Sequence, residues 1–466
     1  MRSIVVAAFI FAMLPVILMK PHVGVLMFSW VSYMNPHRLT YGFAYSFPFA
    51  FIIAALTMVA WFVSKESKAL PLNTINVLIL LLLVWMSVTT AFAWMPDDAF
   101  LKWKEVTKIL VMTFMTTILI NDRKRVEAMS WVIFLSIGFF AIKGGIFTIL
   151  TGGSHRIYGP PSSLIEENNA LALATIMVIP LGVYLMNHAP HKFVRWAMMG
   201  ALPVMFFSVV ASYSRGAFLA MGAMVLVMWF KSKKKLISAL ALVVIVGAVF
   251  SFMPDKYFDR LDTLNTYEED ASAMSRINAW TMALNLAIDN PIMGGGFGVF
   301  GVEHAWSQYA PVPEDMHNAH SIYFEVLAFH GFVGLGLFLA IFVMAYRNGS
   351  HIVARCKKHP TRGWMAELTA MIQVSMLGFA VGGTFLNLAF YDLFWNFVAF
   401  QVILMEILRR EVKAEEEQIR AAKAARARGE TVDEDGGAPM EAPQVSIPRS
   451  AGAAMPPLPG PPPRRS

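Results

Sequence analysis

Apolar segments of membrane-spanning length alternate with short polar segments along most of the chain. A helix needs about 20 apolar residues to cross the hydrocarbon core of a bilayer. Segments close to that length lie near residues 4–19, 22–34, 43–63, 72–94, 106–120, 127–150, 168–187, 193–211, 216–230, 236–253, 321–346, 364–386 and 390–408. The first two are short and could together form one crossing with a re-entrant piece. The pattern predicts an all-α, polytopic integral membrane protein with about 12 transmembrane helices.

Two long polar stretches divide this pattern into four regions. Residues 1–253 are predicted to form an N-terminal transmembrane bundle, and residues 320–410 the C-terminal transmembrane helices. Residues 254–319 between them are predicted to form one large loop. Residues 411–466 form a tail that starts with a charged, Ala-rich stretch, predicted to be a short surface helix. The Pro-rich remainder of the tail is expected to be disordered.

Clusters of Lys and Arg occur in alternate loops of this predicted topology. They are KESK at 65–68, NDRKR at 121–125, HKFVR at 191–195, KSKKK at 231–235, RCKKHPTR at 355–362 and RR at 409–410. Cytoplasmic loops carry the excess of Lys and Arg in membrane proteins, so we expect these loops to be cytoplasmic. Residues 254–319 and Arg215 are then periplasmic, whereas Cys356 and the tail are cytoplasmic.

The composition agrees with a lipid environment and excludes several classes of protein. Hydrophobic residues make up 57% of the 466 positions and charged residues only 15%, too few to cover a soluble globular surface. The net charge of +7 is spread over short loops, which argues against nucleic acid as a partner. The single cysteine excludes intramolecular disulfides and thiolate metal clusters. The GGGFG run at 294–298 follows no strand, so we expect no bound nucleotide and no cofactor.

Two arginines stand out on the predicted periplasmic face. Arg215 lies in SYSRGAF between two apolar segments, where a charge is costly and is a functional candidate by default. The alternative is an interfacial anchor whose side chain reaches water. Arg276 is expected in the first turn of an amphipathic helix over residues 275–289, where it could contact an anion. The alternative for Arg276 is a surface ion pair.

Three histidines lie at the start of the apolar segment that follows the large loop. His317 and His320 are three positions apart, so on a helix they would share a face. No metal-ligand spacing is present, and we expect no metal. A neutral histidine can instead act as a general base toward a hydroxyl. His330 lies deeper and is predicted to be a packed core residue. With the two arginines, these residues indicate transfer chemistry on a phosphate-linked lipid at the outer leaflet.

Several motifs resemble known proteins. SRGAFLA at 214–220, SRINAWTMAL at 275–284 and HNAHSIYFEVLAFHGFVGLG at 317–336 resemble the O-antigen ligase/polymerase superfamily of bacterial inner-membrane proteins. RIYGPPSSLIEENNALALA at 156–174 and the N-terminal half resemble its exosortase A-associated O-glycosylation ligase subgroup. The resemblance extends over nearly all of the chain up to about residue 410.

The resemblance implies a metal-independent glycosyltransferase of the bacterial inner membrane. Such enzymes take a glycan from undecaprenyl diphosphate and transfer it to an acceptor hydroxyl, on a lipid or a protein, at the periplasmic face. It implies that His320 is the catalytic base and that Arg215 and Arg276 bind the pyrophosphate. The substrate-binding candidates that it adds are His317, Asn318, Arg156, Asn168, Asn169 and Tyr213.

The resemblance leaves alternatives open. His317-Asn318 is a second possible match to the His-Asn pair of the family, so the base could be His317. Phe329 stands where the family often has an acidic residue. A polysaccharide polymerase of the same superfamily is an alternative function, because acceptor identity does not reside in a short motif. A transporter of lipid-linked glycans is another, although its internal repeats and midplane charges are not evident in the sequence.

Overall fold

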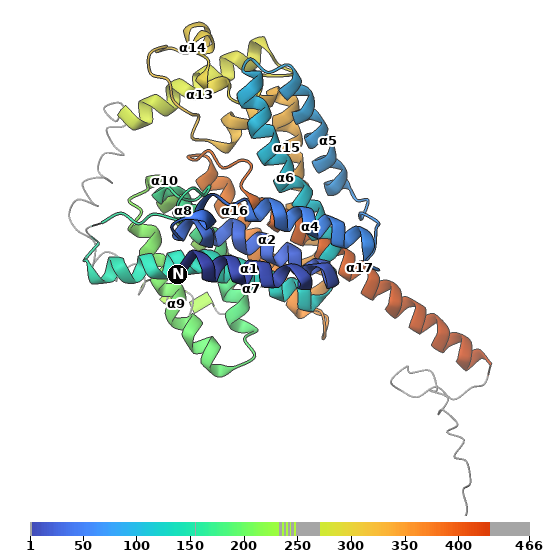
Figure 1. Cartoon of the computed structure of the whole chain (residues 1–466). Helices are drawn as coiled ribbons and strands as arrows, with labels where there is room; N and C mark the ends of the chain where they lie inside the picture. The colour runs from blue at the N-terminus through green and yellow to red at the C-terminus, as the bar shows by residue number, and fades with distance from the viewer. Residues whose placement is uncertain are drawn as a thin grey trace, which may run out of the picture. The chain divides into compact units, whose positions relative to one another are not determined.

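A computed structural model describes residues 2–153, 155–232 and 271–428, together with six isolated positions between 235 and 247. Regular structure in these residues is entirely helical (Figure 1). The elements are α1 (Arg2–Met19), α2 (Pro21–Met34), η1 (Pro36–Leu39), α3 (Phe43–Ser46), α4 (Phe49–Val63), α5 (Thr74–Ala91), α6 (Pro96–Leu119), α7 (Arg123–Leu150), α8 (Asn168–Asn187), α9 (Lys192–Val210), α10 (Arg215–Lys231), α13 (Ala271–Asp289), η3 (Val299–Gly301), α14 (Glu303–Tyr309), α15 (Ile322–Cys356), α16 (Gly363–Gly383) and α17 (Asp392–Ala427). The predicted all-α class is confirmed for the described part of the chain.

Seven of these helices are long and apolar enough to cross a membrane: α1, α5, α7, α8, α9, α15 and α16. The apolar helix α4 has 15 residues and falls short of that length. The prediction of about 12 spans is therefore supported only in part by the described residues. The predicted segment 236–253 and residues 254–270 lie almost wholly outside them.

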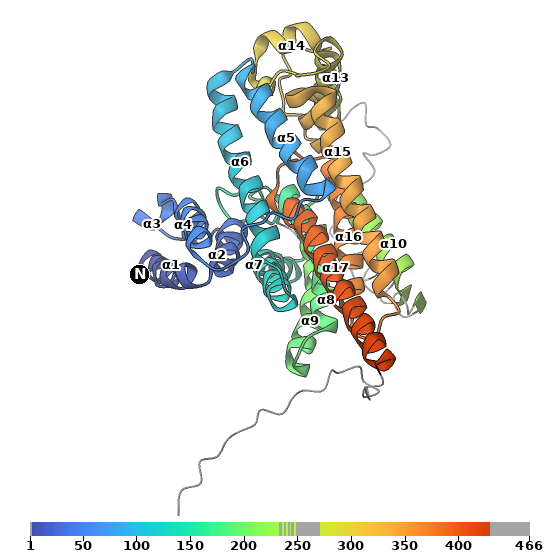
Figure 2. The same cartoon turned by 90° about the vertical axis from the view of Figure 1, so that its right-hand side faces the viewer.

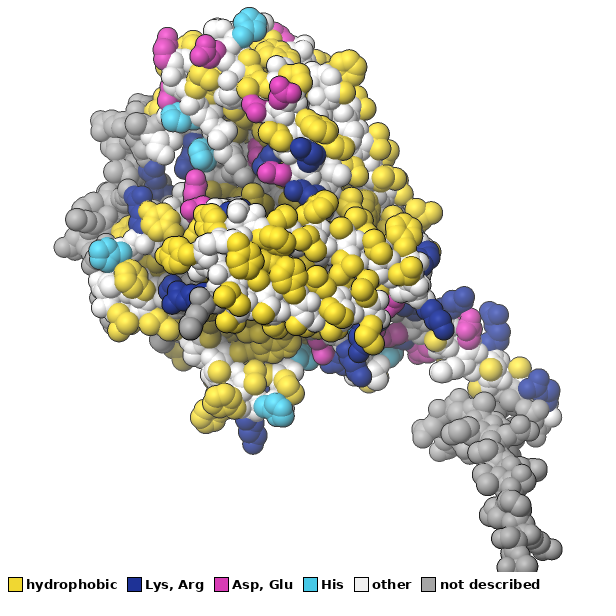
Figure 3. Space-filling view, viewed as in Figure 1, with side chains coloured by type: hydrophobic (Ala, Val, Ile, Leu, Met, Phe, Trp, Pro, Cys, Tyr) yellow, Lys and Arg dark blue, Asp and Glu magenta, His cyan; other side chains and the backbone are white. Residues whose placement is uncertain are grey.

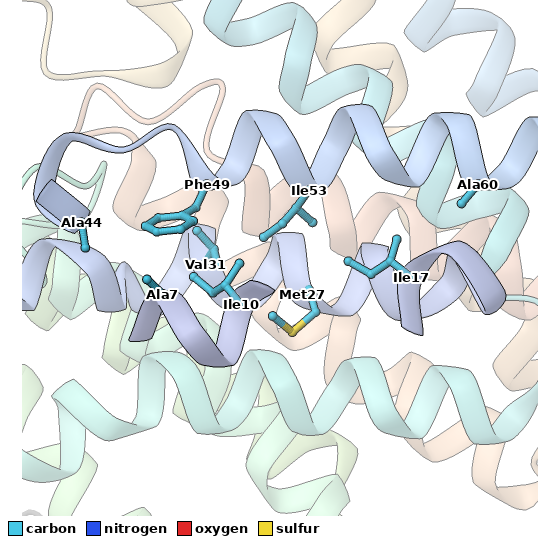
Figure 4. Packing of buried hydrophobic residues seen from close by; sticks show 9 residues of the cluster. All are labelled: Ala7, Ile10, Ile17, Met27, Val31, Ala44, Phe49, Ile53 and Ala60. Carbon is cyan, nitrogen blue, oxygen red and sulfur yellow. The ribbon is translucent and has the colours of Figure 1, made fainter. Parts of the chain in front are cut away.

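The first two apolar segments form separate helices that pack on α4. The chain breaks between α1 and α2 at Lys20, and Pro21 starts the new helix, a position that suits a residue without a backbone N–H. Asn35 ends α2 in the left-handed conformation, with φ 49°. Ile10 and Ile17 of α1 meet Met27 of α2 in a buried apolar cluster to which α4 also contributes (Figure 4).

The outward faces of these helices carry large apolar side chains. Met19, Phe51 and Phe62 expose 80%, 62% and 70% of their surface. Figure 3 shows the apolar surface that such side chains form over α1 and α4. Exposed apolar area of this extent is unusual for a protein surrounded by water and is expected where lipid is the solvent.

Helix α8 is the most buried of the membrane-length helices. It packs against α7, α9, α10 and α16, and α16 also packs against α15 (Figure 2). Fifteen of its twenty residues are buried, which accounts for a sequence that is apolar on every face. Gly382 of α16 permits the close approach, because a Cβ there would lie 2.6 Å from the Leu173 side chain.

Loops predicted on the same side of the membrane contact one another. On the predicted cytoplasmic side, Glu66 pairs with Arg125 at 2.8 Å, and Asn187 donates a hydrogen bond to Glu367 at 2.6 Å. On the predicted periplasmic side, the Asn35 side chain donates to the Pro161 carbonyl at 2.9 Å, and the Trp94 backbone N–H donates to the Gly295 carbonyl at 3.0 Å. This segregation agrees with the alternation of basic loops, but which side faces the cytoplasm stays a prediction.

Helix α15 contains a break that the sequence pattern did not predict. Gly331 has φ 66° and ψ −169°, which divides α15 into two helices. The break leaves three carbonyl groups of the preceding turn without helical donors, and each finds another donor. Gly295 N–H donates to Ala328 at 2.8 Å, Gly296 N–H to Phe329 at 3.0 Å, and Trp85 Nε1 to His330 at 3.0 Å.

The GGGFG segment therefore supplies hydrogen-bond donors to backbone carbonyl groups at the break in α15. Backbone polar groups at membrane depth need partners within the protein, and the segment supplies them by close backbone approach. A Cβ on Gly294 would lie 2.5 Å from the Ala328 carbonyl oxygen, and one on Gly331 would lie 2.4 Å from the Ile292 carbonyl oxygen. Only glycine fits both positions, each of which also has a positive φ.

The chain divides by its contacts into Met1–Leu408 and Arg409–Ser466. In the second unit, residues 409–427 are helical and most of their described side chains are exposed. The surface helix predicted for the start of the tail is present, as the last part of α17 (Asp392–Ala427). The predicted disordered Pro-rich tail lies outside the described residues.

Candidate active site

His320 lies in the loop just before α15 and has an uncommon backbone conformation. Its φ is 42°, in the left-handed region that non-glycine residues seldom adopt. Trp280 of α13 holds the loop by donating a hydrogen bond from Nε1 to the Ala319 carbonyl at 2.6 Å. The Trp280 ring also stacks on Phe324, with 5.1 Å between centroids and 10° between planes. The residues before and after His320 are thus both fixed against the same tryptophan.

Asn278, two residues earlier on α13, fixes the preceding part of that loop. Its buried side chain donates to the carbonyl groups of Val312 at 2.8 Å and Asp315 at 3.1 Å. It also accepts a hydrogen bond from the Val312 N–H at 2.9 Å. These bonds use nearly all the hydrogen-bonding capacity of the amide. Arg276 lies on the same helix, so these bonds fix the position of the His320 loop relative to Arg276.

The electrostatic surroundings of His320 favour a neutral imidazole. Burial lowers the pKa of His320 below its ordinary value of 6.5, the positive charge of Arg276 lowers it further, and His317 adds a smaller effect in the same direction. The Glu167 carboxylate acts in the opposite sense and raises this pKa in part. A half-buried histidine that is neutral at pH 7 has a lone pair ready to accept a proton.

Arg215 is the first residue of α10 and follows a tightly bonded turn. Ser214 caps the helix by accepting a hydrogen bond from the Ala217 N–H at 3.1 Å. Tyr213 has φ 54° and donates its hydroxyl proton to the Gly153 carbonyl. These bonds fix the direction in which the chain enters α10.

The same turn is tied to the start of α8. The Asn168 side chain donates to the Ser212 carbonyl at 2.6 Å. Asn168 directly follows Glu167, which is an electrostatic neighbour of His320. One short stretch of chain thus connects the Arg215 turn with the surroundings of His320.

The structure brings some of the predicted site residues together and not others. Arg276 and His317 are close enough to His320 to shift its pKa. The side chains of Asn168 and Tyr213 bond to backbone carbonyl groups, so they connect segments. Arg156 and Asn318 are exposed, and Asn169 is half-buried in the first turn of α8. None of these three has a described contact with His320.

Two predictions about local geometry were wrong. His317 and His320 do not share a helix face, because α15 begins only at Ile322. His317 is exposed and pairs with Asp315 at 2.9 Å. Arg276 is not in the first turn of its helix, because α13 extends back at least to Ala271. The helix itself and its end before Asn290-Pro291 were predicted correctly.

His330 is a packed core residue, as predicted. It is fully buried, and its Nδ1 lies 2.7 Å from the Thr89 hydroxyl oxygen. Phe297 meets its ring edge-on at 4.5 Å, and Phe329 and Phe390 complete an aromatic surround.

Glu167 is the neighbour of His320 that sequence reasoning missed. It stands at the N-terminus of α8 in the segment EENN, but its side chain makes no capping bond there. An acidic residue that begins a helix without capping it is a weak signal, and only the fold places it beside a histidine 153 positions later. The described residues contain no group of three or more His, Cys, Asp or Glu side chains able to hold a metal ion.

Comparison with known families divides the chain near residue 195. Residues 1–190 match a family of unknown function, DUF5935. Residues 200–339 match the O-Antigen ligase family. Arg215, Arg276 and His320 all lie within this O-antigen ligase region. A search of curated proteins found no match.

The match supports the O-antigen ligase superfamily and a glycosyl-transfer function of its ligase or polymerase type. It also supports lipid-linked glycans as substrates and a multi-pass membrane setting. The exosortase-associated subgroup stays a prediction. The two matched regions are not separate in space, because α8 of the first packs against α10 of the second.

Proposed function

We propose that this protein is a glycan ligase, which transfers a saccharide from undecaprenyl diphosphate to an acceptor hydroxyl at the periplasmic face of the inner membrane. The observation that carries the proposal is a half-buried histidine, His320, beside Arg276 within the O-antigen ligase region. The acceptor is a lipid or a protein. The transfer uses no metal ion.

His320 is the general base in this proposal. As the acceptor oxygen attacks the anomeric carbon of the donor saccharide, its proton passes to the His320 imidazole. The bond between that carbon and the diphosphate oxygen breaks, and the diphosphate leaves with the electron pair. Proton removal of this kind contributes about 10²- to 10⁴-fold to a rate. The proton then leaves His320 for solvent.

The arginines act on the leaving group. Negative charge grows on the diphosphate as its bond to carbon breaks, and guanidinium groups can hold phosphate oxygens in a bidentate manner. We propose that both arginines bind the diphosphate. Arg276 would bind it from the direction of His320, and Arg215 from the direction of the turn between α9 and α10. Glu167 stabilises the imidazolium that forms during transfer, because its carboxylate favours the charged form of His320.

The test uses the purified full chain in lipid nanodiscs with excess chelator. The donor is undecaprenyl-diphosphate-linked glycan from the native host, and the acceptor is an envelope extract from a strain that lacks the gene. We expect single-turnover transfer by the wild type. We expect Arg215→Lys to lose nearly as much activity as Arg215→Ala, about 10- to 100-fold, because lysine keeps the charge but loses the two-point contact.

Three outcomes would contradict the proposal. Activity that disappears in chelator and returns with Mg²⁺ or Mn²⁺ would show a metal-dependent reaction. Donor that is flipped or transported but never transferred would show a transporter. Product that grows only by joining two lipid-linked glycans would identify the polymerase instead of the ligase.

A further inference from the structure

A cavity of about 500 Å³ has Glu325 in its wall, five residues after His320. Its wall is formed by α2, η1, α4, α6, the segment before α8, the start of α15 and the segment before α17. This volume is typical of small-ligand pockets. Figure 3 shows basic and acidic side chains gathered around the recess above α4, an element of this wall. Neither the family match nor the proposed roles of the arginines assigns a function to it.

Two buried carboxylates line the cavity. Glu325 is 7% exposed, and its Oε2 accepts a hydrogen bond from the Ala389 N–H at 3.2 Å. Asp392 is 5% exposed and accepts a hydrogen bond from the Ser32 hydroxyl. Buried carboxylates are costly, and each is anchored here by a group of the wall. Their position in the wall of a cavity makes them available to a ligand as strong hydrogen-bond acceptors.

Buried polar atoms in the same wall have no hydrogen-bond partner among the described residues. They are the hydroxyl of Tyr391, which is 2% exposed, Nδ1 of His37, which is 8% exposed, and Oδ1 of Asn387. A buried polar group without a partner is unfavourable, so such groups at a cavity indicate a ligand that satisfies them. Arg38 and Lys102 also line the cavity and are less buried than the carboxylates.

We propose that this cavity binds a saccharide of the acceptor, an inference that rests on the proposed function. A saccharide presents several hydroxyl groups, each a donor and an acceptor. Such hydroxyls can donate to Glu325 and Asp392 and pair with the Tyr391 hydroxyl. The apolar faces of a sugar ring match the aromatic side chains of Phe28 and Phe390 in the wall.

The position of the cavity favours the acceptor over the donor. Arg215 and Arg276, proposed to hold the donor diphosphate, lie on α10 and α13, and neither helix contributes to the cavity wall. Glu325 follows His320 by five residues, and residues 162–165 of the wall precede Glu167 by a few residues. Since five residues span at most about 18 Å, the part of the cavity wall at Glu325 lies within that distance of the proposed base. A base between two substrate sites is the arrangement that a transfer reaction needs.

Thiol protection tests binding without relying on transfer. Ser163 lines the cavity, and the native Cys356 is buried, so a Ser163→Cys protein carries one reactive thiol. We expect the envelope extract from the gene-deletion strain to slow maleimide labelling of this thiol. In the Ser163→Cys protein, the extract concentration that halves the labelling rate measures binding. Tyr391→Phe should raise this concentration by about three- to tenfold, because one hydrogen bond is lost. Glu325→Gln should also raise it, by about three- to tenfold, because the amide keeps only one accepting oxygen and replaces the other with an N–H₂ group that cannot accept.

Tyr184→Phe is the matched control. The Tyr184 hydroxyl is also buried without a hydrogen-bond partner among the described residues, but it lies in α8 and does not line the cavity. This substitution should leave protection unchanged. In the transfer assay, Tyr391→Phe should raise the half-saturating acceptor concentration and leave that of the donor unchanged.

The outcomes distinguish this inference from the proposed function. Protection that Tyr391→Phe weakens supports the acceptor site even if no transfer is found, which would overturn the proposed function alone. Equal protection in all variants, with unchanged acceptor saturation, would overturn the inference while His320-dependent transfer stands. Protection by purified donor but not by the extract, or by Mg²⁺ or Ca²⁺ alone, would also overturn it.

Discussion

His320 and His330 lie ten residues apart in one stretch of chain, but they occupy opposite kinds of environment. His320 is half-buried in a loop with a positive φ, and charged groups from two other segments act on it. His330 is fully buried at a helix break among aromatic rings, and Thr89 is its polar neighbour. The loop at residue 320 thus leaves its imidazole partly accessible, whereas the imidazole at residue 330 is packed in the protein core.

The contrast shows that the two regions depend on different kinds of interaction. The His320 loop is held by side chains of α13 that bond to its backbone, which leaves the His320 side chain unconstrained by those bonds. The break in α15 is held by backbone bonds from the glycine-rich segment, and the His330 side chain fills the remaining space. Substitutions should therefore affect chemistry in the first region and stability in the second.

The largest expected effect is that of His320→Ala on chemistry. Loss of the base should reduce single-turnover transfer by about 10²- to 10⁴-fold, with donor binding nearly unchanged. Donor binding is measured by titration of the purified variant in nanodiscs. His317→Ala is the control, because His317 is exposed and paired with Asp315, and it should cost much less. An inactive His317→Ala protein beside a nearly normal His320→Ala protein would identify His317 as the base.

His330→Ala should affect stability more than chemistry. Removing the ring leaves a hole among Phe297, Phe329 and Phe390 and deprives the Thr89 hydroxyl of one of its two partners, the other being the Met86 carbonyl. We expect a loss of about 2–4 kcal/mol in the free energy of unfolding. The thermal midpoint of purified protein in nanodiscs measures this loss, and single-turnover transfer measures chemistry at a temperature where the variant is folded. An unchanged thermal midpoint together with lost transfer would show that His330, like His320, acts in the chemistry rather than in stability.

Gly331→Ala tests whether the break in α15 is required. A Cβ there would lie 2.4 Å from the Ile292 carbonyl oxygen, and the backbone has φ 66°. We expect a loss of stability of about 1–3 kcal/mol, read from the thermal midpoint. Gly336→Ala is the matched control on the same helix, because nothing lies within 4 Å of its Cβ. That change should be neutral or slightly stabilising. Equal midpoints for the two variants would show that α15 does not need a glycine at the break.

The smallest effects concern the pH dependence of transfer. Activity needs neutral His320, so it should fall on the acid side as the imidazole takes up a proton. Glu167 raises the pKa of His320, so Glu167→Gln should move the acid limb of kcat/KM to lower pH. Arg276 lowers this pKa, so Arg276→Gln should move the limb to higher pH, in addition to reducing activity. Shifts in the same direction for both variants would contradict the assignment of His320.

The sequence predicted most of the helices because a membrane-spanning helix is recognised from the length of its own apolar run. Apolar runs gave the bounds of α7 and α8 to within a few residues, and amphipathic spacing gave α13. The break at Gly331 was missed because helical periodicity continues through it, and only the distant GGGFG segment makes it possible.

The sequence predicted only part of the candidate site, because the rest depends on contacts between distant segments. The residue types and motifs indicated Arg276 and His320, which the structure places near each other. Glu167 and the cavity wall were missed because they depend on contacts between segments more than a hundred residues apart. The positive φ of His320 also depends on α13, whose tryptophan fixes the loop from outside.

The glycine-rich segment has a mechanical consequence. It follows α13 and bonds to α15 just before the break at Gly331, while Trp280 of α13 bonds to the loop at the beginning of α15. Helix α13 and the first part of α15 are thus joined at both ends, as two sides of a closed frame. Such a frame resists bending, so Arg276 and His320 should keep their separation when the protein moves. Any opening that admits a bulky polyprenyl chain should then displace the turn with Arg215 relative to this frame.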